Sequence, residues 1–166
     1  MKNTQKNLTR RLVLSALLAA LTCVMTMVVK IPSPLNGYIN LGDGAVLLCG
    51  WALGPVYGFL AAGIGSGLAD LLSGYVTYVP ATFVIKGLMA LIVYGGTRLP
   101  WKKGTKLVAG IVAEIVMVLG YFVFEGFLYG FAESAVNIPA NAVQGVAGLI
   151  IGLALSKLFK RTNLFT

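Results

Sequence analysis

Long apolar runs separated by short polar segments constrain the fold of this chain more than any other feature. A helix that crosses a bilayer needs roughly 20 residues, or about 17 to 25 with tilt. Hydrophobic residues make up 58% of the chain and charged residues 11%, which is more apolar surface than a soluble domain of 166 residues can bury. We therefore expect an all-α integral membrane protein with a single domain over residues 1–166. The runs lie at about 12–29, 44–74, 78–97, 106–130 and 138–158.

The run at 44–74 is too long for one spanning helix and contains Gly54-Pro55. Proline cannot continue a regular helix and glycine weakens it, so this dipeptide predicts a break between two helices. The chain is then expected to form six transmembrane helices. Their predicted bounds are about 12–29, 44–53, 55–74, 78–97, 106–130 and 138–158.

The basic residues test this count independently, because lysine and arginine concentrate in cytoplasmic loops. Eleven of the thirteen lie in three segments, which an even number of crossings must separate if all three are cytoplasmic. Six helices satisfy this condition and predict cytoplasmic N- and C-termini. The net charge of +8 is then explained by topology, and nucleic acid is not an expected partner. The three segments contain Lys2, Lys6, Arg10 and Arg11; Arg98, Lys102, Lys103 and Lys106; and Lys157, Lys160 and Arg161.

Lys86 lies inside the otherwise uncharged run at 78–96. A cationic side chain within a spanning helix costs at least about 2.5 to 3.5 kcal/mol on insertion scales, so it is usually paired, water-facing or functional. Lys86 is therefore a candidate site residue. From the sequence its partner could be Glu125, or Glu114 from below.

Polar residues on four predicted helices fall at similar depths on the outer side. With a rise of about 1.5 Å per residue, Lys86 lies roughly 12 Å below the outer boundary and Glu125 about 6 Å below it. Residues spaced by four, such as Thr82 and Lys86, also share one helix face, which turns away from lipid. One interpretation is a hydrogen-bond network that only fixes packing; the other is an outward-opening pocket for a small polar ring compound. The same layer includes Asp70, Asn141 and Gln144.

The outer segments add aromatic and amide side chains to this layer. The first outer loop, 30–43, is rich in Pro and Gly and suits either a shaped lid or a simple connector. The other outer segments are a tight turn near 74–78 and the segment 132–139. The predicted substrate-binding residues are Tyr38, Asn40, Asp70, Tyr75, Tyr78, Thr82, Lys86, Glu125, Tyr129, Asn137, Asn141 and Gln144.

Four motifs occur in an order that resembles the substrate-binding S component of energy-coupling factor (ECF) vitamin transporters. They are YVPATFVIKGL at 78–88, NIPANAVQG at 137–145, INLGD at the end of the first outer loop, and the alanine pattern from Ala16 to Ala20. They are similar to the branch that handles pyridoxine, hydroxymethylpyrimidine and related small rings. The resemblance covers essentially the whole chain.

The resemblance implies a vitamin pocket on the outer side, built from the first outer loop and helices four to six. It implies partners as well: a membrane coupling protein of the EcfT type and two cytoplasmic ATPases in a bacterial cytoplasmic membrane. Ala16 and Ala20 would dock on the coupling protein, and the S component would topple in the membrane to release its substrate. The chain has no G-x-x-x-x-G-K-[ST] loop, so ATP would be used by the partners, and no cofactor is expected in this chain.

Two other classes of protein compete with this interpretation. A self-contained secondary transporter usually shows internal repeats with broken helices in matching positions, and Gly54-Pro55 has no convincing counterpart. An intramembrane enzyme needs a nucleophile with its base or a ligand cluster. Histidine is absent from the chain, so no catalytic residue and no metal site is predicted.

Overall fold

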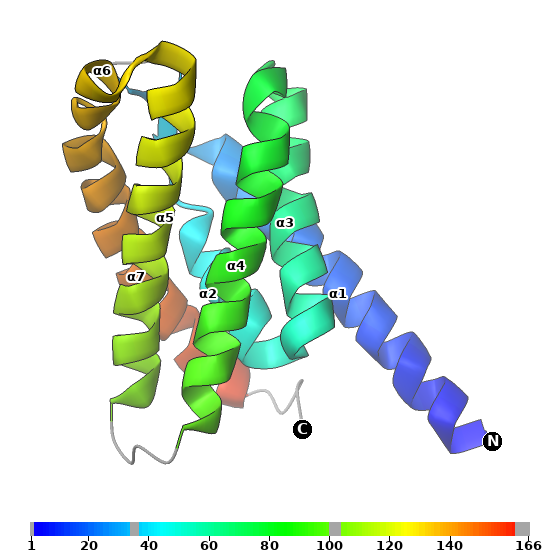
Figure 1. The fold of residues 1–166 in the computed structure, drawn as a ribbon. Coiled ribbons are helices and arrows are strands. Elements are labelled where there is room, and N and C mark those ends of the chain that lie inside the picture. Colours follow the sequence, from blue (N-terminus) through cyan, green and yellow to red (C-terminus); the bar gives the residue numbers. More distant parts are fainter. Residues whose placement is uncertain (1, 34–36, 100–103, 162–166) are drawn as a thin grey trace.

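The protein is a bundle of long helices, with a small β-hairpin at one end (Figure 1). The computed structural model describes residues 2–33, 37–99 and 104–161. A 3-10 turn, η1, and a short helix, α6, lie at the same end as the hairpin. The elements are α1 (Lys2–Val28), β1 (Lys30–Pro32), β2 (Tyr38–Asn40), α2 (Asp43–Leu53), α3 (Pro55–Leu72), η1 (Val76–Tyr78), α4 (Val79–Arg98), α5 (Thr105–Tyr129), α6 (Phe131–Ala135) and α7 (Ile138–Arg161).

Five of the helices in the described residues are long and apolar enough to cross a membrane, and α2 is shorter. The 11 residues of α2 extend over about 16 Å, roughly half of a hydrocarbon core about 30 Å thick. The first eight of them are buried, and α2 packs against α3, α4 and α7. Asn40 and Gly42 are buried as well, so the chain enters the bundle before α2 begins. The segment expected to span at 44–53 is thus an enclosed half-length helix.

The break between α2 and α3 falls where the sequence predicts it. Gly54 adopts a left-handed backbone conformation with φ 84°, and Pro55 starts α3. Glycine adopts this conformation without steric cost, and proline is tolerated in the first turn of a helix because its missing N–H would be unpaired there. The turn reverses the chain, and α3 then packs beside α4.

Close helix packing surrounds α2 and α4. Leu47, Met89 and Met117 are fully buried in the core between α2, α4 and α5. A Cβ atom at Gly63 would lie 2.7 Å from the carbonyl oxygen of Phe83, a distance that would push α3 and α4 apart. Small residues are therefore required where these helices meet, as is common in membrane bundles.

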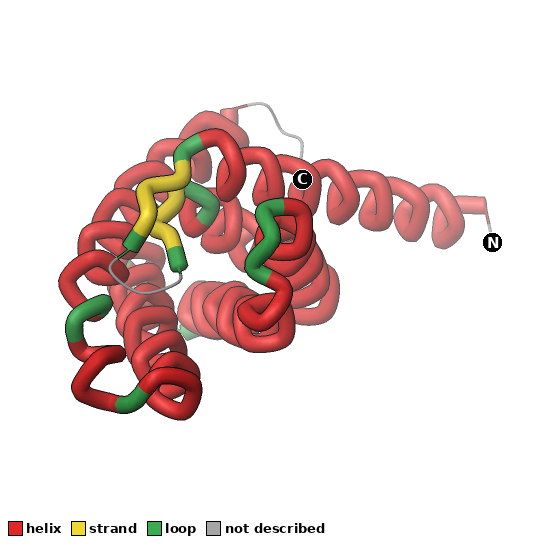
Figure 2. The backbone as a smooth tube through the Cα atoms, turned by 90° about the horizontal axis from the view of Figure 1, so that it is seen from above, coloured by secondary structure: helices red, strands yellow, loops and turns green. Residues whose placement is uncertain are grey.

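One face of α1 packs on the bundle and the other is exposed. Leu18 and Thr22 are buried against α3, where a Cβ atom at Gly65 would lie 2.9 Å from Cβ of Thr22. Ala16 and Ala20 lie on the exposed face. The N-terminal half of α1 leaves the bundle and projects away from it (Figures 1 and 2).

The first outer loop forms an antiparallel hairpin over one end of the bundle (Figure 2). Ile31 pairs with Ile39, and the amide of Ser33 donates to the carbonyl oxygen of Gly37 at 3.0 Å. The loop therefore has a defined structure, which agrees with the interpretation of a shaped lid and not with that of a simple connector. The segment at 132–139 was expected to be a loop, but it contains most of α6. The chain turns at Gly130, whose φ is 106°, and a short helix begins at the next residue.

Candidate functional site

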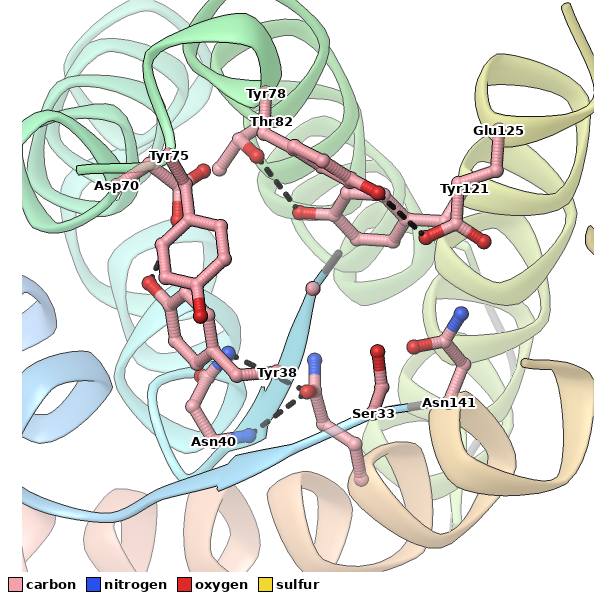
Figure 3. A pocket seen from close by; sticks show the side chains of 12 residues that line it. Ser33, Tyr38, Asn40, Asp70, Tyr75, Tyr78, Thr82, Tyr121, Glu125 and Asn141 are labelled. Atoms are coloured by element: carbon pink, nitrogen blue, oxygen red, sulfur yellow. Dashed lines mark hydrogen bonds between the residues drawn. The ribbon is translucent and has the colours of Figure 1, made fainter. Parts of the chain in front are cut away.

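A polar pocket lies at the end of the bundle that carries the hairpin (Figure 3). It encloses about 390 Å³, including the part that is open to solvent. Its lining comes from the hairpin region, α3, η1, α4, α5 and α7: Ser33, Gly37, Tyr38, Asn40, Asp70, Tyr75, Tyr78, Thr82, Tyr121, Glu125, Asn141 and Gln144.

Tyrosine rings form two sides of this space. The rings of Tyr38 and Tyr75 have centroids 4.8 Å apart, and those of Tyr75 and Tyr78 are 6.3 Å apart and nearly perpendicular. Figure 3 shows Tyr38 and Tyr75 on one side and Tyr78 with Tyr121 on another. Such rings offer flat apolar surfaces with polar ends, which suits a planar ligand.

The carboxylate of Asp70, on α3, is fixed by the hairpin. The hydroxyl of Tyr38 donates to Oδ1 of Asp70 at 2.6 Å. Burial, and secondarily the charge of Asp70, raises the pKa of Tyr38, so its phenol stays protonated and remains a donor. This hydrogen bond connects the hairpin to α3 along one side of the pocket (Figure 3).

The carboxylate of Glu125, on α5, is also oriented by neighbours. The amide of Asn137 donates to both Glu125 oxygens, at 2.9 and 3.0 Å, and the hydroxyl of Tyr78 donates to Oε1 at 3.3 Å. On the adjacent wall, the hydroxyls of Thr82 and Tyr121 lie 3.0 Å apart. The pocket therefore presents two carboxylates, several hydroxyls and amides in fixed orientations.

Lys86 does not line the pocket and forms an ion pair beneath it. Its ammonium donates to Oδ1 of Asp43, the first residue of α2, and both side chains are at most 3% exposed. The ammonium also lies 5.4 Å from the ring centroid of Tyr121. The two partners considered from the sequence, Glu125 and Glu114, are therefore both wrong: the counter-ion is Asp43, which the chain brings into the bundle at the start of α2.

A chain of hydrogen bonds connects this ion pair to the pocket lining. The amide of Gln144 donates to Oδ2 of Asp43 at 2.7 Å. Its carbonyl oxygen accepts from the backbone N–H of Asn40 at 2.9 Å and from the Asn40 side chain at 3.3 Å. The amide N–H of Gly42 in turn donates to the Asn40 side chain at 2.9 Å. The pair thus fixes the positions of two pocket residues, Asn40 and Gln144.

Nine of the twelve predicted binding residues line the pocket, and three do not. Lys86 lies below the pocket. Asn137 lies outside the lining and donates a hydrogen bond to Glu125, which is part of the lining. Tyr129 is half-buried outside the lining. Predicted residues in the lining are Tyr38, Asn40, Asp70, Tyr75, Tyr78, Thr82, Glu125, Asn141 and Gln144.

The prediction missed Ser33, Gly37, Tyr121 and the supporting Asp43. Tyr121 precedes Glu125 by four residues, so helical periodicity places it on the same face and could have identified it. Asp43 carries a weaker signal, as an acidic residue at the junction of the first outer loop and an apolar run. Glu114 is buried beside the cluster; its two carboxyl oxygens have no hydrogen-bond partner among the described residues.

The fold and the pocket together define the protein as a helical, multi-pass membrane protein with a polar pocket at one end of its bundle. The chain belongs to a family of transport subunits: the sequence model of the "ECF-type riboflavin transporter, S component" matches residues 6–161. The resemblance inferred from the four motifs is confirmed.

Relatives of known sequence and structure agree with this assignment. An uncharacterised protein of Pyrococcus woesei is 38% identical over 139 residues, which are 83% of this chain and 93% of that protein. The thiamine precursor transporter HmpT of Lactococcus lactis subsp. cremoris is 27% identical over 157 residues, 93% of this chain and 90% of HmpT. The fold matches that of the S component of a bacterial ECF transporter with a TM-score of 0.75 at 23% identity, covering 93% of this chain and 97% of that chain.

Proposed function

We propose that this protein captures a small ring-shaped vitamin or vitamin precursor from outside the cell and delivers it inward as part of an ECF-type ABC importer. The observation that carries the proposal is a pocket walled by tyrosines and lined by oriented carboxylates, in a chain of the S component family. This membership favours an S component over a self-contained secondary transporter. We place the protein in the cell membrane, with six crossings and the pocket on the outer side.

The distribution of charge supports this orientation. The hairpin, η1 and α6 lie at one end of the bundle, and the ends of α4 and α7 with their basic residues lie at the other (Figure 1). Arg98 ends α4, and Lys160 is in the last turn of α7. Lysine and arginine are enriched on the cytoplasmic side of membrane proteins, and this supports termini inside and the pocket outside.

The charge of the lining restricts the class of substrate. Asp70 and Glu125 line the pocket, and none of its twelve described lining residues is basic. Lys86 is held by Asp43 below the lining, and Lys30 is exposed, 3.0 Å from the hydroxyl of Ser73. An anionic ligand would meet two carboxylates with no compensating cation, an arrangement that costs free energy in a partly desolvated site. The substrate is therefore an uncharged or cationic compound that donates hydrogen bonds.

The tyrosine rings favour a flat ring as the substrate. Rings on two sides of the pocket can stack against a pyridine or a pyrimidine. Pyridoxine and hydroxymethylpyrimidine meet both conditions, and the relative HmpT is named as a thiamine precursor transporter. These two compounds are our favoured substrates.

Transport requires energy from other subunits. We infer that the chain joins an EcfT-type coupling protein and two cytoplasmic ATPases, which use ATP, and that it contributes no catalysis of its own. The exposed Ala16 and Ala20 on α1 offer a surface where a partner helix can approach closely. The opposite face of α1 already packs against α2 and α3 and is not available to a partner.

Identification of the bound compound tests this proposal. The purified protein should release a small ring compound on denaturation, detectable by mass spectrometry. Isothermal titration of the emptied protein should show binding of pyridoxine or hydroxymethylpyrimidine and much weaker binding of riboflavin. Accumulation of the substrate in proteoliposomes without any ATPase subunit would contradict the S component role.

Pyridoxine and its 5′-phosphate are a matched pair of ligands that tests whether the two carboxylates of the lining exclude anionic compounds. They share the ring and differ by a phosphate, so the phosphate should abolish measurable binding if two carboxylates face the ligand. Equal affinity for both compounds would show that charge does not select the substrate.

A further inference from the structure

A second cleft lies at the end of the bundle opposite the pocket, between the projecting half of α1 and the ends of α2, α3 and α4. It encloses about 1700 Å³, open solvent at its mouth included. Arg10 and Arg11 line it from α1 and Arg98 from α4. The substrate pocket and its ion pair do not involve these residues.

The bundle-facing side of α1 changes from apolar to polar residues where the helix leaves the bundle. Leu18 is buried against the neighbouring helices, and Leu14, Arg11 and Asn7 precede it on the same side at helical spacing. The exposed apolar residues, such as Leu17, are on other faces. Arg11 therefore lies on the side of α1 that faces the cleft.

Guanidinium groups of α1 and α4 line the same cleft without an acidic residue in that lining. The five acidic residues of the chain are Asp43, Asp70, Glu114, Glu125 and Glu133, and the lining contains none of them. Arg11 and Arg98 are exposed on the two walls of the cleft, so an anion that enters it can reach a guanidinium group. Guanidinium groups bind phosphate in a bidentate geometry, which makes a phosphate ester the best chemical match.

The remaining lining fits a lipid better than a free anion. Tyr57 and Tyr94 lie in the cleft, and Arg98 stacks 5.1 Å from the ring centroid of Tyr94. Tyrosine is typical of the membrane interface. Leu14, Val56 and other apolar residues in the same lining can contact an acyl chain. Basic pockets between transmembrane helices on the cytoplasmic side bind anionic lipid headgroups in other proteins.

We propose that this cleft binds the phosphate headgroup of an anionic phospholipid, with Arg11 of α1 and Arg98 of α4 as its basic residues. The lipid would close the gap between the projecting half of α1 and the bundle and so set the angle of that helix, whose exposed face carries Ala16 and Ala20. The proposal uses the cytoplasmic placement of this end but is independent of which substrate occupies the pocket.

Native mass spectrometry with added lipid tests this site. Phosphatidylglycerol should bind the detergent-solubilised protein in preference to phosphatidylcholine. Arg11→Gln combined with Arg98→Gln should weaken phosphatidylglycerol binding at least about tenfold, equivalent to about 1.4 kcal/mol, because direct hydrogen bonds from the guanidinium groups to the phosphate are lost. The matched control is Lys157→Gln with Lys160→Gln, which removes two charges from exposed positions outside the cleft. This control should retain the wild-type affinity, and both variants should retain substrate binding.

Three results would overturn the proposal. Equal loss of lipid in both double variants would indicate diffuse attraction by net charge. Displacement of phosphatidylglycerol by inorganic phosphate at low millimolar concentration would indicate a site for the free anion. Unchanged lipid binding, with failure of the arginine variant alone to assemble with coupling subunits, would assign the cleft to a protein partner.

Discussion

The ion pair between Lys86 and Asp43 gives the sharpest test of how this bundle supports its pocket. Both side chains are almost fully buried. Lys86→Met leaves the carboxylate of Asp43 without its cation, and Asp43→Asn leaves the ammonium without its anion. The double variant removes both charges, and the asparagine introduced at position 43 retains an oxygen that can accept the hydrogen bond from Gln144, which is 2.7 Å long in the native protein.

Burial sets the magnitude of each change. Removal of one partner of a buried pair typically destabilises a protein by about 3–5 kcal/mol, because the other charge is left uncompensated. Neutralising both partners removes that penalty, so the two single effects should not add. We expect a coupling energy of about 2–3 kcal/mol, at the upper end of the range for residues in contact.

The same variants separate two roles of Lys86 in ligand binding. Lys86→Met should weaken binding at least about tenfold, equivalent to about 1.4 kcal/mol. If the lysine acts through Asp43, Gln144 and Asn40, the double variant should recover most of this affinity. A lysine whose ammonium contacts the ligand would give no such recovery.

Stability is measured by unfolding in mixed micelles and affinity by isothermal titration of the same preparations. Lys157→Met is the matched control, since Lys157 is an exposed lysine in the C-terminal part of α7, away from the pocket. It should change stability by no more than about 0.5 kcal/mol, as is usual for a surface position. Strictly additive stability losses would refute the proposed coupling. A double variant that binds as weakly as Lys86→Met would refute the indirect role.

Three further predictions concern the pocket and the docking face. Glu125→Gln should lower the affinity for a hydrogen-bond-donating substrate about tenfold, an effect of about 1.4 kcal/mol on titration, and unchanged affinity would give the carboxylate a structural role only. Tyr38→Phe removes the 2.6 Å hydrogen bond to Asp70 and should destabilise the protein by about 1.5–3 kcal/mol in the same unfolding assay, and a loss below about 0.5 kcal/mol would show that this bond does not stabilise the fold. Ala16→Trp or Ala20→Trp should spare substrate binding by the isolated subunit and block assembly with the coupling protein, so normal complex recovery in size-exclusion chromatography would reject this docking surface.

The positions and faces of the long helices were predictable because local chemistry determines them. Gly54-Pro55 ends one helix and starts the next, and the break in the structure falls at that dipeptide. Depth and periodicity place Asp70, Glu125 and Gln144 on inward faces at the hairpin end of the bundle, where the structure shows them in one pocket. A regular helix fixes the height and direction of each side chain from its residue number alone.

The partner of Lys86 was not predictable by the same reasoning. The depth estimate applies to residues in regular helices, and the segment from Asn40 to Gly42 is not helical. Its path into the bundle brings Asp43 to the level of Lys86, although the sequence places this residue at the end of an outer loop. Helical periodicity gives no information about a hairpin of two short strands. The sequence therefore could not decide between a lid and a connector for 30–43.

The path of this segment explains why the pocket and the buried pair form one unit. Asn40 ends β2 and is bonded through its backbone N–H to Gln144 on α7, while Gln144 is bonded to Asp43 at the start of α2. Movement of β2 away from α7 would break the hydrogen bonds between Asn40 and Gln144, whereas the ion pair and the bond between Gln144 and Asp43 join α4, α2 and α7 without the hairpin. Because a buried charge is costly in a membrane without its partners, Lys86 and Asp43 favour the arrangement in which Asp43 accepts from Gln144, and Gln144 in turn holds the end of β2 over the pocket.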